Sequence, residues 1–146
     1  PVPKRRIPIV SAGQSPAGMQ FVAQHADRNF VQAGPDRLRE IVAGIKKAGS
    51  ETGRSVGAYA VFHVIAADTD EAAEAMTQHI IENADSTAIY NFIASAMLDT
   101  NPNGISAYQT QGLSRSAEDG NSAFMSIPVI TGSYETVARK IREIYA

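Results

Sequence analysis

The sequence has no cysteine among its 146 residues, which excludes disulfide bonds, thiolate chemistry and zinc sites built on cysteine. A cysteine-free chain fits the reducing cytoplasm, where we expect it to be located. The sequence also has no apolar run near the roughly 18 residues that a membrane-spanning helix needs, and its start is too poor in apolar residues for a signal peptide. We therefore expect a soluble chain with no membrane partner.

The chain also lacks an excess of charge of either sign. Thirteen basic and fifteen acidic side chains give a formal net charge of −2, which predicts no general attraction to nucleic acid or anionic membranes. The three histidines, His25, His63 and His79, show none of the spacings of metal ligands, so we expect no metal site. His63 lies within an apolar run and is interpreted as a core histidine with satisfied hydrogen bonds.

Several nucleotide and catalytic motifs are absent. Gly13 and Gly18 have the spacing of a P-loop, but Met19 and Gln20 stand where Lys and Ser or Thr would be needed. The paired glycines of a dinucleotide fingerprint and the G-x-S-x-G elbow of acyl transferases are missing as well. Acidic residues such as Asp70 fall in a first helical turn, where they complement the helix dipole. The residues alone therefore identify no catalytic group.

The stretch 7–18 is the most informative feature that is present. An apolar run, residues 7–10, predicts a buried strand, and Gly13 relaxes the steric limits on the backbone that follows it. Ser15 and Pro16 then predict a helix start, with the hydroxyl at the N-cap and proline at the first helical position. Two interpretations are open: a well-capped helix, or a helix N-terminus that binds a phosphate.

The order of elements up to residue 67 indicates an α/β fold. Amphipathic spacing predicts helices over 16–25 and 36–48, and the run VGAYAVFHVIAA, residues 56–67, predicts one central strand covered on both faces. A shorter strand is expected at 29–32. Strands and helices that alternate at this spacing are typical of right-handed βαβ units on a parallel sheet.

Helices follow one another in the second half of the chain. Residues 68–82 and 85–98 predict a helical hairpin, with Thr69 as the N-cap of its first helix. Residues 101–125 are polar and rich in turn signals, so we expect a mobile segment that becomes ordered with ligand. Arg115 is its one cation and is interpreted as a solvated side chain. A last helix, preceded by Gly132 and Ser133, runs to the end.

Several short motifs are spread over most of the chain. They are Ala12-Gly13-Gln14-Ser15, Ala17-Gly18-Met19, His25-Ala26-Asp27, Asn29-Phe30, Thr52-Gly53-Arg54 and Gly132-Ser133-Tyr134. Together they resemble the C-terminal half of the bacterial-luciferase-like flavin monooxygenases, nearest in pattern to the pyrimidine monooxygenases.

The resemblance implies a TIM barrel, with residues 7–12, 29–32 and 57–67 as its fifth, sixth and seventh strands. It implies an FMN-dependent monooxygenase that uses O2 on a small organic, pyrimidine-like substrate, with reduced flavin supplied by an NAD(P)H-dependent reductase. It assigns the FMN phosphate to Ser15, with Gln14 and Gly13 beside it. The expected layout is one partial barrel unit: βα repeats at 1–68, a helical insertion and loop at 69–131 after the third strand, and a final helix at 132–146.

Four strands that the family has before this region are absent, and the chain ends before the eighth. We therefore expect this piece to be inactive alone and to pair with itself, as a homo-oligomer, or with the remainder of a barrel. The alternative is a truncated, non-catalytic interaction module that self-associates through open sheet edges.

Overall fold

The computed structural model describes all residues except 1–2, 97, 99–120, 126 and 146. The chain forms two compact units, residues 1–61 and 62–146, and each is described by itself. Most of the segment 101–125, including Arg115, lies outside the described residues. No helix within the described part is long and apolar enough to cross a lipid bilayer.

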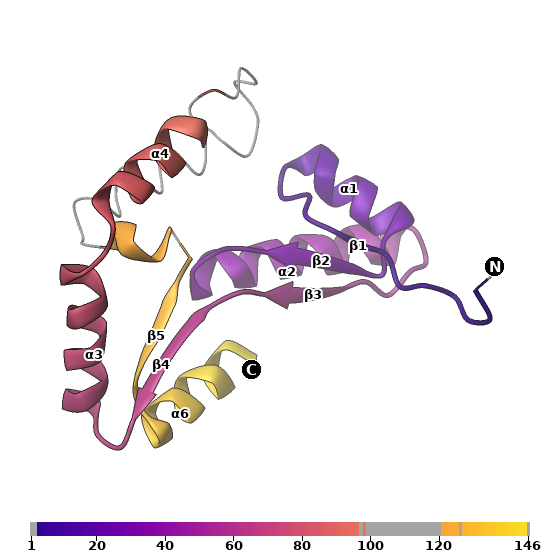
Figure 1. The fold of residues 1–146 in the computed structure, drawn as a ribbon. Coiled ribbons are helices and arrows are strands. Elements are labelled where there is room, and N and C mark those ends of the chain that lie inside the picture. Colours follow the sequence, from indigo (N-terminus) through magenta and orange to yellow (C-terminus); the bar gives the residue numbers. More distant parts are fainter. Residues whose placement is uncertain (1–2, 97, 99–120, 126, 146) are drawn as a thin grey trace. The chain divides into compact units, whose positions relative to one another are not determined.

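Unit 1 alternates strands and helices. Its elements are β1 (Val10–Ser11), α1 (Pro16–His25), β2 (Arg28–Val31), α2 (Pro35–Glu51) and β3 (Gly57–Ala60). The strands are parallel in the order β1-β2-β3, with Ser11 opposite Asn29 and Phe30 opposite Tyr59 (Figure 1). Parallel strands joined by helices are the expected βαβ arrangement, so the α/β fold class is confirmed.

The core of unit 1 lies between the strands and the two helices. Leu38, Ile41 and Ile45 recur at helical spacing on one face of α2 and are buried, as the sequence predicts. In β2 the alternate residues Asn29 and Val31 are fully buried, while Arg28 and Phe30 are exposed. One face of the sheet therefore packs on the helices, and its other face is open.

The first strand differs from its prediction. It has two residues, and Ile7, Ile9 and Val10 are about half exposed where a strand buried on both faces was expected. β1 stands at the end of the sheet and pairs only with β2 among the described strands, so nothing described covers its apolar residues.

The predicted strand over 56–67 is two strands. β3 ends at Ala60 and pairs with β2, whereas β4 (His63–Ala67) pairs with β5 (Val129–Ser133) in a separate two-stranded sheet. Both strands consist mostly of apolar residues, so the sequence reads as one continuous apolar run. The two strands nevertheless pair with different neighbours. Sequence periodicity reports apolar character and not the identity of the neighbouring strand.

Unit 2 is built on the parallel pair β4 and β5, in which His63 is opposite Val129 and Ala67 opposite Ser133. Helices α3 (Asp70–Glu82) and α6 (Tyr134–Tyr145) flank this pair, and the 3-10 helix η1 (Asn121–Phe124) precedes β5 (Figure 1). The buried side chains come from all these elements: Ile65, Ala73, Thr77, Phe124, Ile130 and Val137. Thr69 caps α3 through a 3.1 Å bond from the amide of Ala72, as predicted.

The predicted helical hairpin is not formed. α4 (Ser86–Ala96) leads away from the end of α3 and does not return alongside it (Figure 1). None of its described side chains is buried, and Tyr90 and Phe92 are exposed. The apolar face of α4 that suggested packing on α3 has therefore no described partner.

Candidate functional site

The turn between β1 and α1 forms the helix start that the sequence predicts. Ser15 is the N-cap in an extended conformation, its Oγ accepts from the amide of Gly18 at 3.1 Å, and Pro16 opens the helix. The carbonyl of Ser15 accepts the first helical bond, from Met19, at 2.8 Å. The Ser15 hydroxyl keeps its own proton as a donor, because its oxygen acts here as an acceptor.

Free backbone donors remain at this helix start. No described residue accepts a hydrogen bond from the amides of Gln14, Ser15 or Ala17. Ser15 and Ala17 are exposed and Gln14 is half-buried. Unpaired amides beside the positive end of a helix dipole can bind an anion.

Gly13 and Gly18 touch across the turn. A Cβ atom added to Gly13 would lie 2.7 Å from the carbonyl carbon and oxygen of Gly18, and one added to Gly18 would lie 2.8 Å from Gly13 Cα. The φ angle of Gly13 is not positive, so the backbone there does not need the conformational freedom of glycine, and that expectation is wrong. Glycine is required at both positions because the two backbones approach too closely for any side chain.

Asn29 of β2 contacts the same turn through a side-chain hydrogen bond. Its Nδ2 donates to the carbonyl of Gly13 at 2.9 Å, and the residue is fully buried. Its Oδ1 is buried without a hydrogen-bond partner. In the sequence, Asn29 stands out only as part of a family motif, because the bond joins residues 16 positions apart.

The start of α1 is also distinguished by charge. α1 has no acidic residue in its first turn, and Gly18 and Met19 bond only to Ser15. Each of the other described α-helices has a carboxylate at its start: Asp36 for α2, Asp70 and Glu71 for α3, Asp85 for α4, and Glu135 with Asp70 for α6. The positive end of α1 is therefore the one that no carboxylate of the described chain occupies.

The start of α6 has its anion built in. Asp70 Oδ1 accepts from the amide of Ser133 at 2.5 Å, and Oδ2 accepts from the Thr136 hydroxyl at 3.2 Å. These bonds, the Ser133 amide first, lower the pKa of Asp70 below its usual value, and Lys140 adds a smaller charge effect. Ser133 Oγ caps the helix by accepting from the amide of Thr136 at 3.2 Å.

The opposite end of unit 1 carries a structural cluster. Asp27 accepts from the amide of Ile9 at 2.8 Å and pairs with Arg6 at 2.8 Å, and Arg54 lies 3.9 Å away. The Ile9 bond is the largest of the effects that lower the pKa of Asp27. These contacts tie the lead-in of β1 to β2, so we assign the cluster to stability and not to ligand binding.

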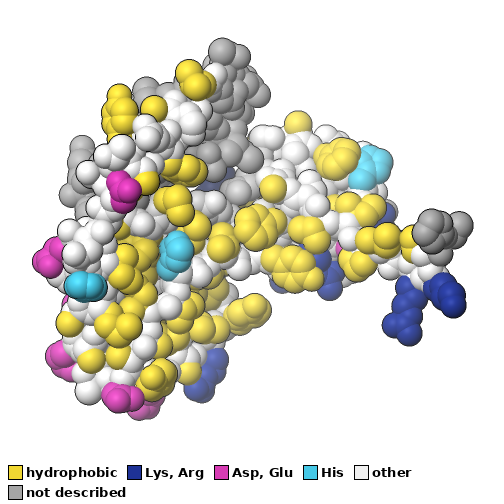
Figure 2. Space-filling view, viewed as in Figure 1, with side chains coloured by type: hydrophobic (Ala, Val, Ile, Leu, Met, Phe, Trp, Pro, Cys, Tyr) yellow, Lys and Arg dark blue, Asp and Glu magenta, His cyan; other side chains and the backbone are white. Residues whose placement is uncertain are grey.

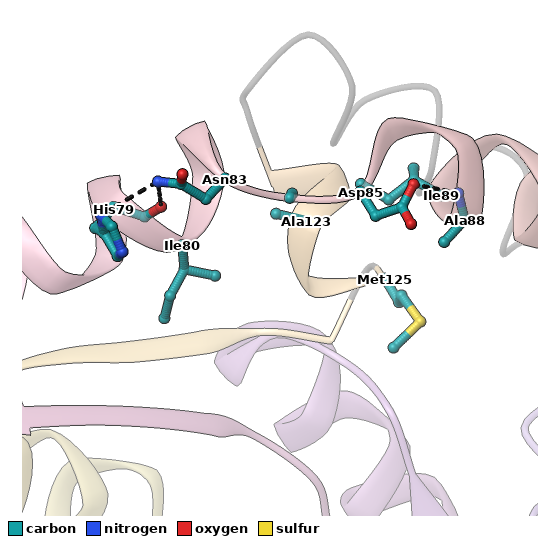
Figure 3. A pocket seen from close by; sticks show the side chains of 9 residues that line it. His79, Ile80, Asn83, Asp85, Ala88, Ile89, Ala123 and Met125 are labelled. Carbon is teal, nitrogen blue, oxygen red and sulfur yellow. Dashed lines mark hydrogen bonds between the residues drawn. The ribbon is translucent and has the colours of Figure 1, made fainter.

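Unit 2 contains an open hollow of about 400 Å³ between α3, α4 and η1 (Figure 3). His79 on α3 and Asn83, the C-cap of that helix, line one side, with Asn83 Nδ2 3.2 Å from His79 Nδ1, and Met125 lines another. The lining has no cluster of charges that would select a ligand. Across the described residues, no group of three or more His, Asp or Glu side chains is placed to hold a metal ion.

His63 departs from its prediction. Its ring packs on Phe124 with centroids 5.5 Å apart, but Nε2 is buried and has no hydrogen-bond partner. The interpretation as a core histidine with satisfied hydrogen bonds is therefore wrong in that the ring leaves one nitrogen unpaired. Its position at the start of β4 places it in unit 2.

Comparison with known proteins agrees with the resemblance seen in the motifs. The sequence model of the luciferase-like monooxygenases matches residues 1–146. A pyrimidine monooxygenase RutA from Bradyrhizobium sp. is 40% identical over 98% of this chain and 39% of its own length. RutA from Cronobacter sakazakii is 34% identical over 100% of this chain and 43% of its own length. The chain thus spans about two fifths of these relatives.

Solved structures share the fold. DmoA from Hyphomicrobium sulfonivorans superposes with a TM-score of 0.75 at 24% identity, over 97% of this chain and 35% of that one. The EDTA monooxygenase EmoA from Chelativorans sp. gives 0.72 at 15% identity, over 99% and 38%. With the family model matching from end to end, the chain belongs to the luciferase-like monooxygenase family.

Proposed function

We propose that this chain is the flavin-phosphate-binding part of an FMN-dependent monooxygenase, and that Gly13, Gln14 and Ser15 hold the phosphate. The observation that carries the proposal is the start of α1. Free amides lie there beside the positive end of the helix dipole, and no carboxylate of the described chain occupies the position. Membership of the luciferase-like monooxygenases supports the cofactor, and the pyrimidine monooxygenases among the relatives support a small pyrimidine-like substrate.

The residues present fit a phosphate. The Ser15 hydroxyl can donate to one phosphate oxygen while its oxygen continues to accept from Gly18. The amides of Gln14, Ser15 and Ala17 add backbone donors, and the exposure of Ser15 leaves the approach open. When bound, reduced FMN supplies the electrons for O2 activation, and the chain's own contribution is binding and orientation.

The remaining parts of the enzyme follow from the same proposal. β1, β2, β3 and β4 serve as barrel strands within βα repeats over 1–68. An insertion at 69–131 and a last segment at 132–146, which contains the final helix α6, follow them; β5 (Val129–Ser133) crosses the boundary between these two parts. In such a barrel the Gly13–Ser15 turn lies at the C-terminal end of β1, on the face where active sites form. An NAD(P)H-dependent reductase supplies reduced FMN, O2 is the co-substrate, and a homo-oligomer or further barrel strands complete the site.

Removal of the Ser15 hydroxyl tests the proposal. Ser15→Ala in the intact protein should weaken FMN binding by roughly tenfold, the worth of one hydrogen bond to a charged group. Ser133→Ala is the matched control, since it removes the same kind of cap from α6, where Asp70 already supplies the anion. Titration of flavin fluorescence measures both affinities. Equal FMN affinity in Ser15→Ala and the unmodified protein would remove Ser15 from the site.

A second candidate is favoured by the open surface of unit 1. Val10, Phe30 and Tyr59 are 47%, 41% and 52% exposed on three adjacent strands, and apolar side chains gather along these strands in Figure 2. This apolar face could pack on a second copy, and β1, which pairs only with β2 among the described strands, offers an edge for pairing in a non-catalytic module that self-associates through open sheet edges. Light scattering decides, because a monodisperse monomer of the 146-residue chain would contradict self-association.

A further inference from the structure

Asn29 is an unusual residue for its place in the fold. It lies in the middle strand of unit 1 and is fully buried on the helix-facing side, where Val31 is its apolar neighbour two positions on. Asparagine is among the residues that strands disfavour, and a buried apolar side chain would fill this position at lower cost. The packing of the strand alone therefore does not account for an amide here.

The amide is only half satisfied. Nδ2 donates to the carbonyl of Gly13 at 2.9 Å, and this bond fixes which end of the amide faces the turn. A flipped amide would set two oxygens against each other, so Oδ1 is the atom left buried without a partner. An unpaired buried acceptor is destabilising, which means that the bond to Gly13 is retained at some cost to the stability of the unit.

The direction of one backbone donor follows from this bond. In a planar trans peptide, the carbonyl of one residue and the N–H of the next point in opposite directions. The carbonyl of Gly13 points inward to Asn29, so the amide of Gln14 points away from the buried side. That amide has no acceptor among the described residues.

We infer that Asn29 is a positioning residue that presents the Gln14 amide as an anion donor before any ligand arrives. Gly13 and Gly18 also approach so closely that a Cβ on either would lie 2.8 Å or less from backbone atoms of the other, which leaves the turn little room to rearrange. Asn29 does not touch the ligand; it acts through Gly13. In naming the ligand a phosphate, the inference rests on the function proposed above, whereas the orientation of the Gln14 amide does not.

The test compares Asn29→Leu with Val31→Ala in the intact protein. Leucine has the same branched heavy-atom skeleton as asparagine but is larger. It removes the unpaired Oδ1 and also leaves the Gly13 carbonyl without its donor, so its unfolding midpoint should fall by no more than that of Val31→Ala. Its affinities for FMN and for inorganic phosphate should nevertheless fall by roughly five- to tenfold. Val31→Ala removes buried apolar volume, so it should lower the unfolding midpoint. It leaves the bond from Asn29 to Gly13 in place, so both affinities should be unchanged.

Three outcomes would overturn the inference. Unchanged affinity in Asn29→Leu is the first, and a loss of affinity that merely follows lost stability, as in Val31→Ala, is the second. The third concerns the free protein: the NMR order parameter of the Gln14 N–H should be lower in Asn29→Leu than in the unmodified chain, and equal order parameters would refute the positioning role. This last readout needs no ligand, so it separates a failure of the inference from a failure of the proposed FMN site.

Discussion

The starts of α1 and α6 share one design and differ in one charge. Each begins with a serine N-cap whose oxygen accepts a backbone amide, at Ser15 and at Ser133, and each follows a parallel strand. At α6 the carboxylate of Asp70 bonds to the amide of Ser133, whereas the free amides of α1 meet no carboxylate. The same local motif is thus closed by the chain in unit 2 and left open in unit 1. Only the open one is available to an external anion.

Ser15→Asp should abolish the difference and give the largest effect. Aspartate caps a helix as well as serine does, so α1 should keep its stability or gain up to about 1 kcal/mol from the dipole. The new carboxylate would occupy the anion position, so FMN affinity should fall roughly tenfold to a hundredfold, as for a lost charge-assisted hydrogen bond.

Ser133→Asp is the control for this change. It adds a second carboxylate beside Asp70, so the two charges should repel and lower the stability of unit 2, with FMN affinity unchanged. Calorimetric titration with FMN measures the affinities, and urea unfolding measures the stabilities. If Ser15→Asp binds FMN as tightly as the unmodified protein, the start of α1 is not the anion site.

Gly13→Ala should have the next largest effect, because it breaks the geometry of the open start. The added Cβ would lie 2.7 Å from backbone atoms of Gly18, which cannot swing away as a flexible side chain would. We expect a loss of about 1–3 kcal/mol in the free energy of unfolding, typical of overpacking. The turn should also hold FMN less tightly once its backbone has shifted.

Gly34→Ala is the matched control for that substitution. Gly34 is the N-cap of α2 with φ of −63°, and a Cβ there would meet nothing within 4 Å. Alanine is a poorer N-cap than glycine, which offsets the gain from the reduced entropy of the unfolded chain, so we expect a smaller loss of stability than in Gly13→Ala. Urea unfolding of both variants decides, and equal stabilities would show that the Gly13 to Gly18 contact relaxes freely.

How far each helix start was predictable depends on the distance in sequence between its parts. Ser15 and Pro16 are adjacent, so the bounds of α1 were predicted correctly from local capping preferences. The bonds from Asn29 to Gly13 and from Ser133 to Asp70 join residues 16 and 63 positions apart, and no local pattern signals them. Asp70 was interpreted only as a first-turn residue of α3, because the sequence does not tell which second helix it reaches.

The strand errors have a similar origin. Apolar character correctly predicted strand residues at 57–60 and 63–67, but as one strand; only the pairing with β2 and then with β5 reveals two sheets. The exposed residues before β1 were predicted to be buried because an apolar run implies a cover, and their cover is not among the described elements.

Asp70→Asn should have the smallest effect and refines the comparison from the closed side. Asparagine can still accept from the Ser133 amide, so only the charge at the start of α6 is lost. The pKa of Asp70 is lowered in the folded protein, so its charge stabilises the fold above the ordinary carboxyl pKa of about 4. That contribution is lost as the pH falls through the lowered folded pKa.

Urea unfolding should therefore show a difference in the free energy of unfolding between the unmodified protein and Asp70→Asn that is constant near neutral pH and disappears in acid. Asp27, whose pKa is also lowered, remains in the variant and should keep part of its acid sensitivity. FMN affinity should not change at any pH in this series, since Asp70 serves α6; a parallel loss of FMN binding would mean that the two helix starts are not independent.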